Sequence, residues 1–479
     1  MIRMCRARLA TVLALAVLLV GTGRLSGQEA GRSGSHAADL VPPQEQPVLR
    51  DLVSAVSSRR IEADIRRLVS FGTRHTLSDT VSESRGIGAA RRWIKAEFDR
   101  ISEECGGCLE VSYQRVLEPD GDRIPEPVEI VNVIAIQRGM NDPGRYVIMS
   151  GDIDSRVSDP MDATSDSPGA NDNASGVAGV LEAARVLSSR RFSGTIVYAA
   201  LSGEEQGLYG GRNLAALAAS EGWRVAGVLN NDMIGNVEGI TGIVDNTSAR
   251  VFSEGTRAVE TEREARIRRF TGGEVDSPSR NLARYVKILA ERYVPNLDVM
   301  LIYRLDRFGR GGHHRPFNEA GFAAVRIMET NENYRRQHQD LRTDAGVEYG
   351  DVIAGVDFEY AAKLTALNVI TLASIAWAPP APSGVRIRGA VSPSTTLAWE
   401  PVDRDVAPDL AGYRIYWRLT TSPEWNHTVY VGDTVEATLQ DVIIDNWFFG
   451  VASVSNSGFE SPVVFPGPAG AFFGGSTDP

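Results

Sequence analysis

The segment RYVIMSGDIDS (145–155) runs from a β-rich stretch directly into two aspartates. TIVYAAL (195–201) and AGVLNND (226–232) are further strand-like runs that lead into acidic residues. Between them, ASGVAGVLEAARVLSSR (174–190) carries apolar residues at helical spacing. This alternation predicts an α/β layer fold with a largely buried central sheet.

Acidic residues stand at the ends of these runs: Asp152, then the pair Glu204 and Glu205, then Asp232. In α/β folds, ligands bind beyond the carboxyl ends of the strands. Carboxylates gathered at one sheet edge, together with a histidine, are the ligands that two neighbouring divalent cations need. We therefore predict a metal site at this edge.

The composition is typical of a soluble globular protein. Its 479 residues are too many for one ordinary domain and predict two or three. An apolar content of 43% and a charged content of 23% differ from those of disordered or fibrous proteins. The net charge of −11 argues against non-specific nucleic-acid binding, so we expect no nucleic-acid partner.

The N-terminus is basic and precedes the apolar run LATVLALAVLLVG (9–21), a pattern typical of a secretory signal. We predict a signal peptide over 1–27 and a flexible leader over 28–48. The alternative is an uncleaved anchor, but the run is short for a membrane span and no stop-transfer flank follows. The mature protein is expected to be secreted or periplasmic, with no membrane span.

Cys105 and Cys108 stand in ECGGC, where two glycines allow a tight turn. An oxidising compartment favours a local disulfide between them. The rival interpretation is a redox-active pair, which usually lies between a strand and a helix, and no such setting surrounds these cysteines.

Two boundaries divide the chain after the leader. A catalytic domain is expected over 49–376, followed by the Pro-rich linker WAPPAPSG (377–384). The region 385–470 has short strands and turns, and its pattern around Trp399 and Tyr413 resembles a fibronectin type III sandwich. We expect this all-β module to carry no catalysis and to bind another protein or a surface polysaccharide.

The stretch 240–285 is rich in Arg and Glu, with Ser and Gly interspersed. This composition is typical of an exposed surface. We expect a surface excursion or subdomain that covers the site.

Five segments in order resemble the M28 family of co-catalytic zinc peptidases over about residues 50–375. They are GDIDS (151–155), GANDNASG (169–176), SGEEQG (202–207), NNDMIG (230–235) and GHHRPF (312–317). A pair of glutamates alone is common by chance, but five motifs in this order, each at or near a strand end, are specific. The resemblance implies a phosphorylase/hydrolase-like catalytic domain, which is a three-layer α/β/α fold with a mixed sheet. It also implies two divalent metal ions, zinc above all, and a peptide substrate.

The resemblance also implies the ligand set. Asp172 corresponds to the carboxylate that bridges both ions, and the peptide bond after it is expected to be cis. Asp152 and Asp232 stand at the positions of the first ion's other ligands. Glu205 and His314 correspond to the ligands of the second ion.

Glu204 corresponds to the general base of the family. It would accept a proton from the water between the ions and pass it to the leaving amine. His338 and Tyr334 lie where relatives place residues that help to stabilise the oxyanion. Arg307 and Arg310 are close enough in sequence to His314 to contact a substrate carboxylate.

Asp152 is a departure from the family pattern, since relatives carry a histidine there. The role of Asp154, which orients that histidine in relatives, is therefore open. His313 in turn stands where relatives often carry an acidic residue. Three interpretations follow. In the first, Asp152 is a ligand in a site that also tolerates Mn²⁺ or Mg²⁺. In the second, the first metal site is weak or empty and one zinc is enough for hydrolysis, and in the third the site is a relic and the protein only binds its ligand.

The pattern predicts an exported aminopeptidase. A carboxypeptidase or dipeptidase is the alternative, favoured if Arg307 or Arg310 faces the metal. Two further classes are a catalytically silent binding protein on the same fold and an adhesion protein that acts through its C-terminal module.

Overall fold

The computed structural model describes residues 41–466. The predicted signal peptide, most of the leader and the last four residues of the predicted C-terminal module lie outside these residues. An eight-stranded mixed sheet organises the first part, with strand order β1-β2-β4-β3-β5-β8-β6-β7. Its strands are β1 (Glu110–Glu118), β2 (Val128–Gln137), β3 (Asp142–Asp152), β4 (Gly194–Leu201), β5 (Arg224–Asn231), β6 (Ser248–Phe252), β7 (Asp298–Ile302) and β8 (Ala324–Glu329).

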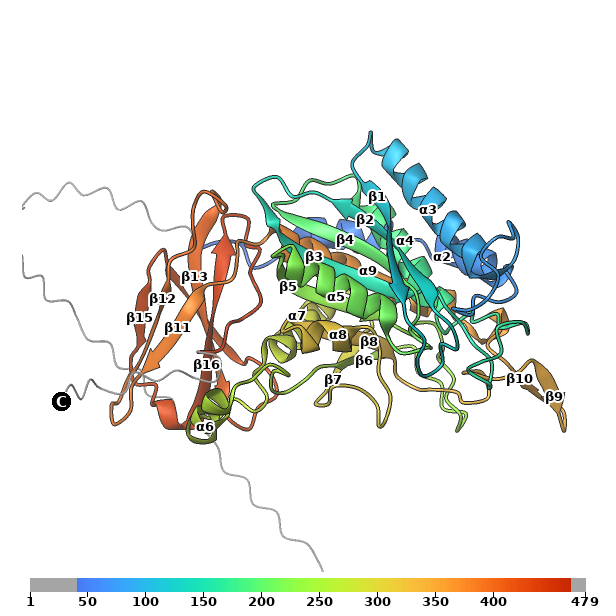
Figure 1. Cartoon of the computed structure of the whole chain (residues 1–479). Helices are drawn as coiled ribbons and strands as arrows, with labels where there is room; N and C mark the ends of the chain where they lie inside the picture. Colours follow the sequence, from blue (N-terminus) through green and yellow to red (C-terminus); the bar gives the residue numbers. More distant parts are fainter. Residues whose placement is uncertain (1–40, 467–479) are drawn as a thin grey trace, which may run out of the picture. The chain divides into compact units, whose positions relative to one another are not determined.

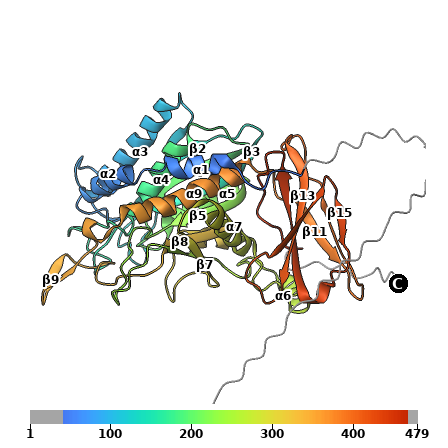
Figure 2. The ribbon, with the colours of Figure 1, turned by 180° about the vertical axis from the view of Figure 1, so that it is seen from behind.

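Helices cover both faces of this sheet, which confirms the predicted three-layer fold (Figures 1 and 2). The helices of residues 41–377 are α1 (Pro47–Ala55), α2 (Ser58–Val69), α3 (Gly86–Glu104), α4 (Ala174–Leu187), α5 (Tyr209–Ser220), α6 (Glu262–Thr271), α7 (Pro278–Tyr293), α8 (His314–Glu319) and α9 (Phe358–Trp377). Helices α4 and α9 pack on one face in the larger apolar core, whereas α5 and α8 pack on the other face in a smaller one. A short hairpin, β9 (Arg342–Asp344) and β10 (Val347–Tyr349), lies outside the main sheet.

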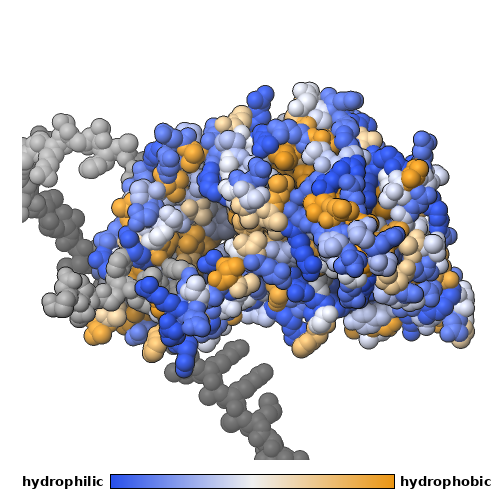
Figure 3. Space-filling view, viewed as in Figure 1, coloured by the Kyte–Doolittle hydropathy of each residue, from blue (hydrophilic) through white to orange (hydrophobic). Residues whose placement is uncertain are grey.

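The central strands β4, β3, β5 and β8 are parallel neighbours. Every residue of β4 is buried, as expected for a parallel strand covered on both faces, whose sequence is a continuous apolar run. Within the described residues, α9 is the one helix that is long and apolar enough to cross a membrane, but most of it is buried in the core. In the view of Figure 3, apolar surface residues form separate patches among hydrophilic ones.

The prediction of a surface subdomain over 240–285 is wrong in part. β6 lies inside the main sheet, between β8 and β7. It is only five residues long, SARVF, and contains one arginine and one serine, so it lacks the clear apolar pattern of a buried strand. By contrast, α6 has no buried residue and fits the expectation of an exposed segment.

The residues after α9 form two three-stranded antiparallel sheets that enclose a separate apolar core around Trp399 and Tyr413. Their strands are β11 (Ser383–Arg388), β12 (Thr395–Glu400), β13 (Leu410–Leu419), β14 (His427–Gly432), β15 (Glu436–Leu439) and β16 (Trp447–Ser455). An all-β C-terminal part is therefore present, whereas its fibronectin type III character and the exact domain boundaries stay predictions. At the end of α3, the structure joins Cys105 and Cys108 in a disulfide.

A buried ion cluster connects β13 with the chain just before α7. Arg418 Nη2 lies 2.7 Å from Asp276 Oδ1, and Arg284 Nη1 lies 2.8 Å from the same oxygen. We expect Asp276→Ala to lower the free energy of unfolding by about 3–5 kcal/mol, because two buried guanidinium groups lose their counter-charge. Urea unfolding measures this change.

Asp298→Ala is the matched control. Asp298 pairs with Lys287 at 2.7 Å, but its side chain is 64% exposed. The control should cost no more than about 1 kcal/mol. Equal losses from both variants would contradict the assignment of a stabilising buried cluster.

Candidate metal centre

The predicted acidic residues meet at one edge of the main sheet. Asp152 ends β3, Glu204 and Glu205 follow β4, and Asp232 follows β5. Because β3, β4 and β5 are parallel neighbours, their carboxyl ends lie together.

A pocket opens at this edge. Its lining combines carboxylates, one imidazole and several guanidinium groups. The lining residues are Arg123, Arg156, Asp172, Glu204, Glu205, Gly207, Leu208, Asp232, Arg307, Gly309, Arg310, Gly311, Arg315 and His338.

Three of these side chains converge on one point. His338 Nε2 lies 3.0 Å from Asp172 Oδ2 and 2.9 Å from Glu205 Oε1. Within residues 41–466, Asp172, Glu205 and His338 form the one group of acidic, histidine or cysteine side chains close enough together to hold a metal ion. Burial lowers the pKa of His338, but the carboxylates of Glu205 and Asp172 outweigh it and raise the pKa to about 9. Arg156 braces the cluster, with Nε 2.7 Å from Glu205 Oε2 and Nη2 2.7 Å from His338 Nδ1.

Backbone contacts set the position of Asp172. The amides of Asn171 and Asp172 donate hydrogen bonds to the carboxylate of Asp351, at 2.7 Å from the Asp172 nitrogen. The peptide bond between Asp172 and Asn173 is cis, as the family resemblance predicts. Asn173 then caps α4 by accepting a hydrogen bond from the Gly176 amide at 3.0 Å.

Asp154 holds the turn that carries the two glutamates. Its Oδ2 accepts hydrogen bonds from Thr76 Oγ1 and from the Glu205 amide, each at 3.0 Å. Its Oδ1 accepts a hydrogen bond from the Glu204 amide at 3.2 Å. The sequence left the role of Asp154 open, and the structure shows that it orients Glu204 and Glu205.

The carboxylate of Glu204 faces the pocket without a hydrogen-bond partner among the described residues. Burial and the neighbouring Glu205 raise the pKa of Glu204 well above its usual range. Such a carboxyl group can take up a proton and release it again, as a general base and acid must.

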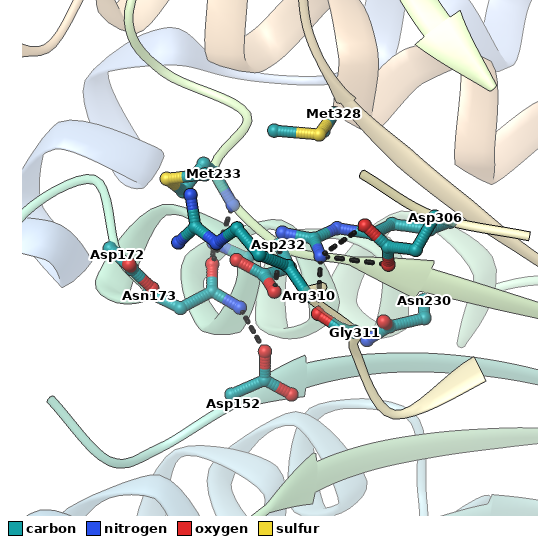
Figure 4. A network of polar contacts seen from close by, with 12 residues as sticks. Asp152, Asp172, Asn173, Asn230, Asp232, Met233, Asp306, Arg310, Gly311 and Met328 are labelled. Atoms are coloured by element: carbon teal, nitrogen blue, oxygen red, sulfur yellow. Dashed lines mark hydrogen bonds and ion pairs between the residues drawn. The ribbon is translucent and has the colours of Figure 1, made fainter. Parts of the chain in front are cut away.

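Asp152 and Asp232 have other partners. Asp152 Oδ1 lies 2.5 Å from His313 Nδ1, and its Oδ2 accepts a hydrogen bond from Asn173 Nδ2 at 2.8 Å. Figure 4 shows the Asn173 amide directed at Asp152. Asp232 Oδ2 lies 2.7 Å from Nη2 of Arg326, a fully buried residue of β8. Sequence reasoning missed Arg326, although an arginine inside the apolar run AAVRIME is an unusual feature.

Comparison with known proteins agrees with this geometry. Residues 132–345 match the model of peptidase family M28. A probable zinc metalloprotease of Leptosphaeria maculans is 45% identical over 90% of this chain and 99% of that protein. The chain belongs to peptidase family M28. A probable zinc metalloprotease of Pyrenophora teres f. teres is 42% identical, over 90% of this chain and 89% of its own length.

Solved structures show the same fold. Legionella pneumophila LapA superposes with a TM-score of 0.51 at 19% identity, covering 70% of this chain and 78% of LapA. LapB of the same organism also reaches a TM-score of 0.51 at 19% identity, over 70% of this chain and 76% of LapB. Both confirm the mixed α/β core.

The similar proteins of L. maculans and P. teres f. teres are named probable zinc metalloproteases, so zinc is the metal to compare with these side chains. Asp172, Glu205 and His338 fit it, since zinc takes imidazole nitrogen and carboxylate oxygen ligands. A further ion on Asp152 and Asp232 would compete with His313 and Asn173, which contact the two oxygens of Asp152, and with the Arg326 guanidinium, which contacts Asp232 Oδ2.

The structure does not bring the predicted ligand His314 to this cluster. His314 is buried at the start of α8, and its Nε2 donates a hydrogen bond to the Leu305 carbonyl at 2.8 Å. His338 is the histidine that lies beside Asp172 and Glu205. It lies in the loop after β8 with φ of 52°, a left-handed conformation that local sequence does not reveal.

The remaining predicted contacts divide between the pocket and the surface. Tyr334 is 56% exposed and is not among the residues that line the pocket. Arg310 does line it, with Nη1 3.2 Å from Glu332 Oε2 and 3.0 Å from Gln337 Oε1. Arg307 lies beside it and contacts the same Glu332 oxygen at 2.8 Å.

We expect Asp154→Asn to lower kcat about 10–100-fold, because an amide cannot accept both backbone hydrogen bonds that orient the two glutamates. Stability should also fall by about 1–3 kcal/mol, since a buried donor loses its partner. Steady-state kinetics and urea unfolding measure the two effects. The control is Asp120→Asn, an exposed aspartate that should leave both unchanged.

Proposed function

We propose that this chain is an exported, zinc-dependent aminopeptidase that hydrolyses the N-terminal peptide bond of its substrates. The observation that carries the proposal is the Glu204 carboxylate, which has no hydrogen-bond partner among residues 41–466 and lies in the same pocket as Asp172, Glu205 and His338. The basic and apolar N-terminus supports export.

Each of these residues has a separate role in hydrolysis. Zinc held by Asp172, Glu205 and His338 would supply Lewis acidity toward the scissile carbonyl. Glu204 accepts the proton of the attacking water and delivers it to the leaving amine. Asp154 accepts hydrogen bonds from the backbone amides of Glu204 and Glu205 and so fixes the turn that carries both side chains.

Two observations support an amino-terminal rather than an internal cleavage site. Carboxylates of Asp172, Glu204 and Asp232 line one pocket, which favours the ammonium group of a peptide N-terminus. The L. pneumophila LapA structure, which shares the fold, is that of an aminopeptidase.

A carboxypeptidase or dipeptidase is the second candidate, and Arg307 and Arg310 favour it. Both line the pocket, and both contact Glu332, which also pairs with Arg250 at 3.0 Å. Three guanidinium groups around one carboxylate have a net positive charge, which can bind the terminal carboxylate of a substrate.

The test is a comparison of two substrate sets with the purified mature protein. Aminoacyl-anilides with a free N-terminus should be hydrolysed, whereas N-acetylated dipeptides with a free C-terminus should not. Activity should disappear with 1,10-phenanthroline and return with Zn²⁺. The reverse preference would establish the carboxypeptidase, and no hydrolysis together with no bound zinc would leave a binding protein.

Arg310→Ala separates the two candidates further. For an aminopeptidase we expect kcat/KM on aminoacyl-anilides to change by less than about threefold. If Arg310 binds a substrate carboxylate, kcat/KM on free-carboxylate substrates should fall about 10–150-fold, which corresponds to losing a hydrogen bond to a charged group.

A further inference from the structure

The carboxylate of Asp152 is fully engaged by the protein. His313 Nδ1 lies 2.5 Å from one oxygen, and Asn173 Nδ2 donates a hydrogen bond to the other at 2.8 Å. Asp152 is 2% exposed and is not among the residues that line the pocket. An ion at this carboxylate would compete with two buried side chains that already contact its oxygens.

His313 does not offer its free nitrogen to the pocket. The residue is fully buried, and its Nε2 has no hydrogen-bond partner among the described residues. The adjacent Cδ2 packs against α5, where a Cβ atom added at Gly211 would lie 2.6 Å from it. The imidazole edge that carries Nε2 therefore faces α5, and His313 acts as a partner of Asp152.

Asp232 faces a permanent cation. Arg326 Nη2 lies 2.7 Å from Asp232 Oδ2, and Arg326 Nη1 lies 3.0 Å from Asp306 Oδ2 and 2.6 Å from the Gly311 carbonyl oxygen. Arg326 is fully buried, and a guanidinium group does not give up its proton in proteins. Two carboxylates and a carbonyl hold this charge in place, in the cluster drawn in Figure 4 around Asp232, Asp306 and Gly311.

We propose that this centre holds one divalent ion, on Asp172, Glu205 and His338, and that the Arg326 guanidinium and the Asp152–His313 pair replace the second ion of a co-catalytic site. The inference deepens the proposed function and rests on it. An ion beside Asp232 would lie close to a buried guanidinium, where like charges repel strongly because little water screens them.

The Asp152–His313 pair explains the departure seen in the sequence. The family resemblance implies a histidine at position 152 and often an acid at position 313, and this chain has Asp152 and His313 there. The exchange keeps an acid and an imidazole in contact. As a result, the Asp152 side chain contacts the buried His313 in the protein interior.

The first experiment is the zinc content of the full mature chain. The protein is saturated with ZnCl₂, freed of loosely bound metal by gel filtration and measured by inductively coupled plasma mass spectrometry. We expect one zinc per chain, and two zincs per chain would overturn the inference.

Variants designed to bind a second zinc test which residues exclude that ion. The triple variant Asp152→His, His313→Asp, Arg326→Met should bind two zincs, whereas the double variant that keeps Arg326 should stay at one. Arg315→Met is the matched control, because Arg315 also lines the pocket but is 38% exposed and contacts Glu319 only at 3.5 Å. It should stay at one zinc.

Three outcomes overturn the inference: two zincs in the wild type, two in the double variant, or one in a triple variant whose circular dichroism shows the native fold. If the triple variant does not fold, the wild-type and double-variant values decide. No zinc and no hydrolysis would instead refute the proposed function. Two zincs with normal turnover would refute this inference alone.

Discussion

Glu204→Gln is expected to lower kcat by about 10²–10⁴-fold while zinc stays bound, because the amide cannot accept a proton from the attacking water. Glu204 lines the pocket, and its carboxylate has no hydrogen-bond partner among residues 41–466, so the substitution breaks no structural contact of that group. Turnover of aminoacyl-anilides and zinc content are measured on the same preparation.

The neighbouring Glu205→Gln is the contrasting variant. Glu205 Oε1 lies 2.9 Å from His338 Nε2 in the candidate ligand cluster, and Glu205 Oε2 pairs with Arg156 at 2.7 Å. We expect this variant to lose zinc as well as turnover. If Glu204→Gln lost zinc and Glu205→Gln kept it, the roles of the two residues would have to be exchanged.

His338→Gln is expected to weaken zinc binding by more than about 100-fold. Changing a residue that only orients a metal ligand weakens metal binding by about 10–100-fold, and loss of a ligand should have a larger effect. Stability provides a readout that is independent of activity. Zinc at 100 times its Kd should stabilise the wild type by about 2.7 kcal/mol, and this gain should disappear in the variant. Urea unfolding with and without zinc measures the difference.

The control for this prediction is His314→Gln. His314 donates a hydrogen bond to the Leu305 carbonyl at 2.8 Å, so the variant should lose some stability but keep its gain from zinc. Loss of the gain from zinc in the His314 variant, with retention in the His338 variant, would restore the assignment made from the sequence motif.

The outline of the fold and the edge that carries the site follow from local sequence. A buried parallel strand such as β4 is a continuous apolar run, and its end marks where an acidic ligand stands. The resemblance likewise places Asp172 and Glu205 in the pocket. These features depend on residues that are close together in the chain.

The parts that sequence did not predict depend on distant contacts. His314 and His338 both follow strands, and only the packed structure shows that one contacts Leu305 and the other meets Asp172. Arg326 is an arginine in an apolar run, and its meaning appears only when Asp306 and Asp232 are brought beside it.

Phe459, which follows β16, belongs to the same apolar core as α9 and packs against Trp377, with the two rings tilted and their centroids 4.9 Å apart. Chains are synthesised from the N-terminus, and domains generally fold as units during synthesis. The core of the catalytic part would therefore be complete only when Phe459 has been added, near the end of synthesis. A chain shortened at 376 should therefore fold less cooperatively and aggregate more readily than the whole protein. In this sense the C-terminal module also completes the folding of the enzyme.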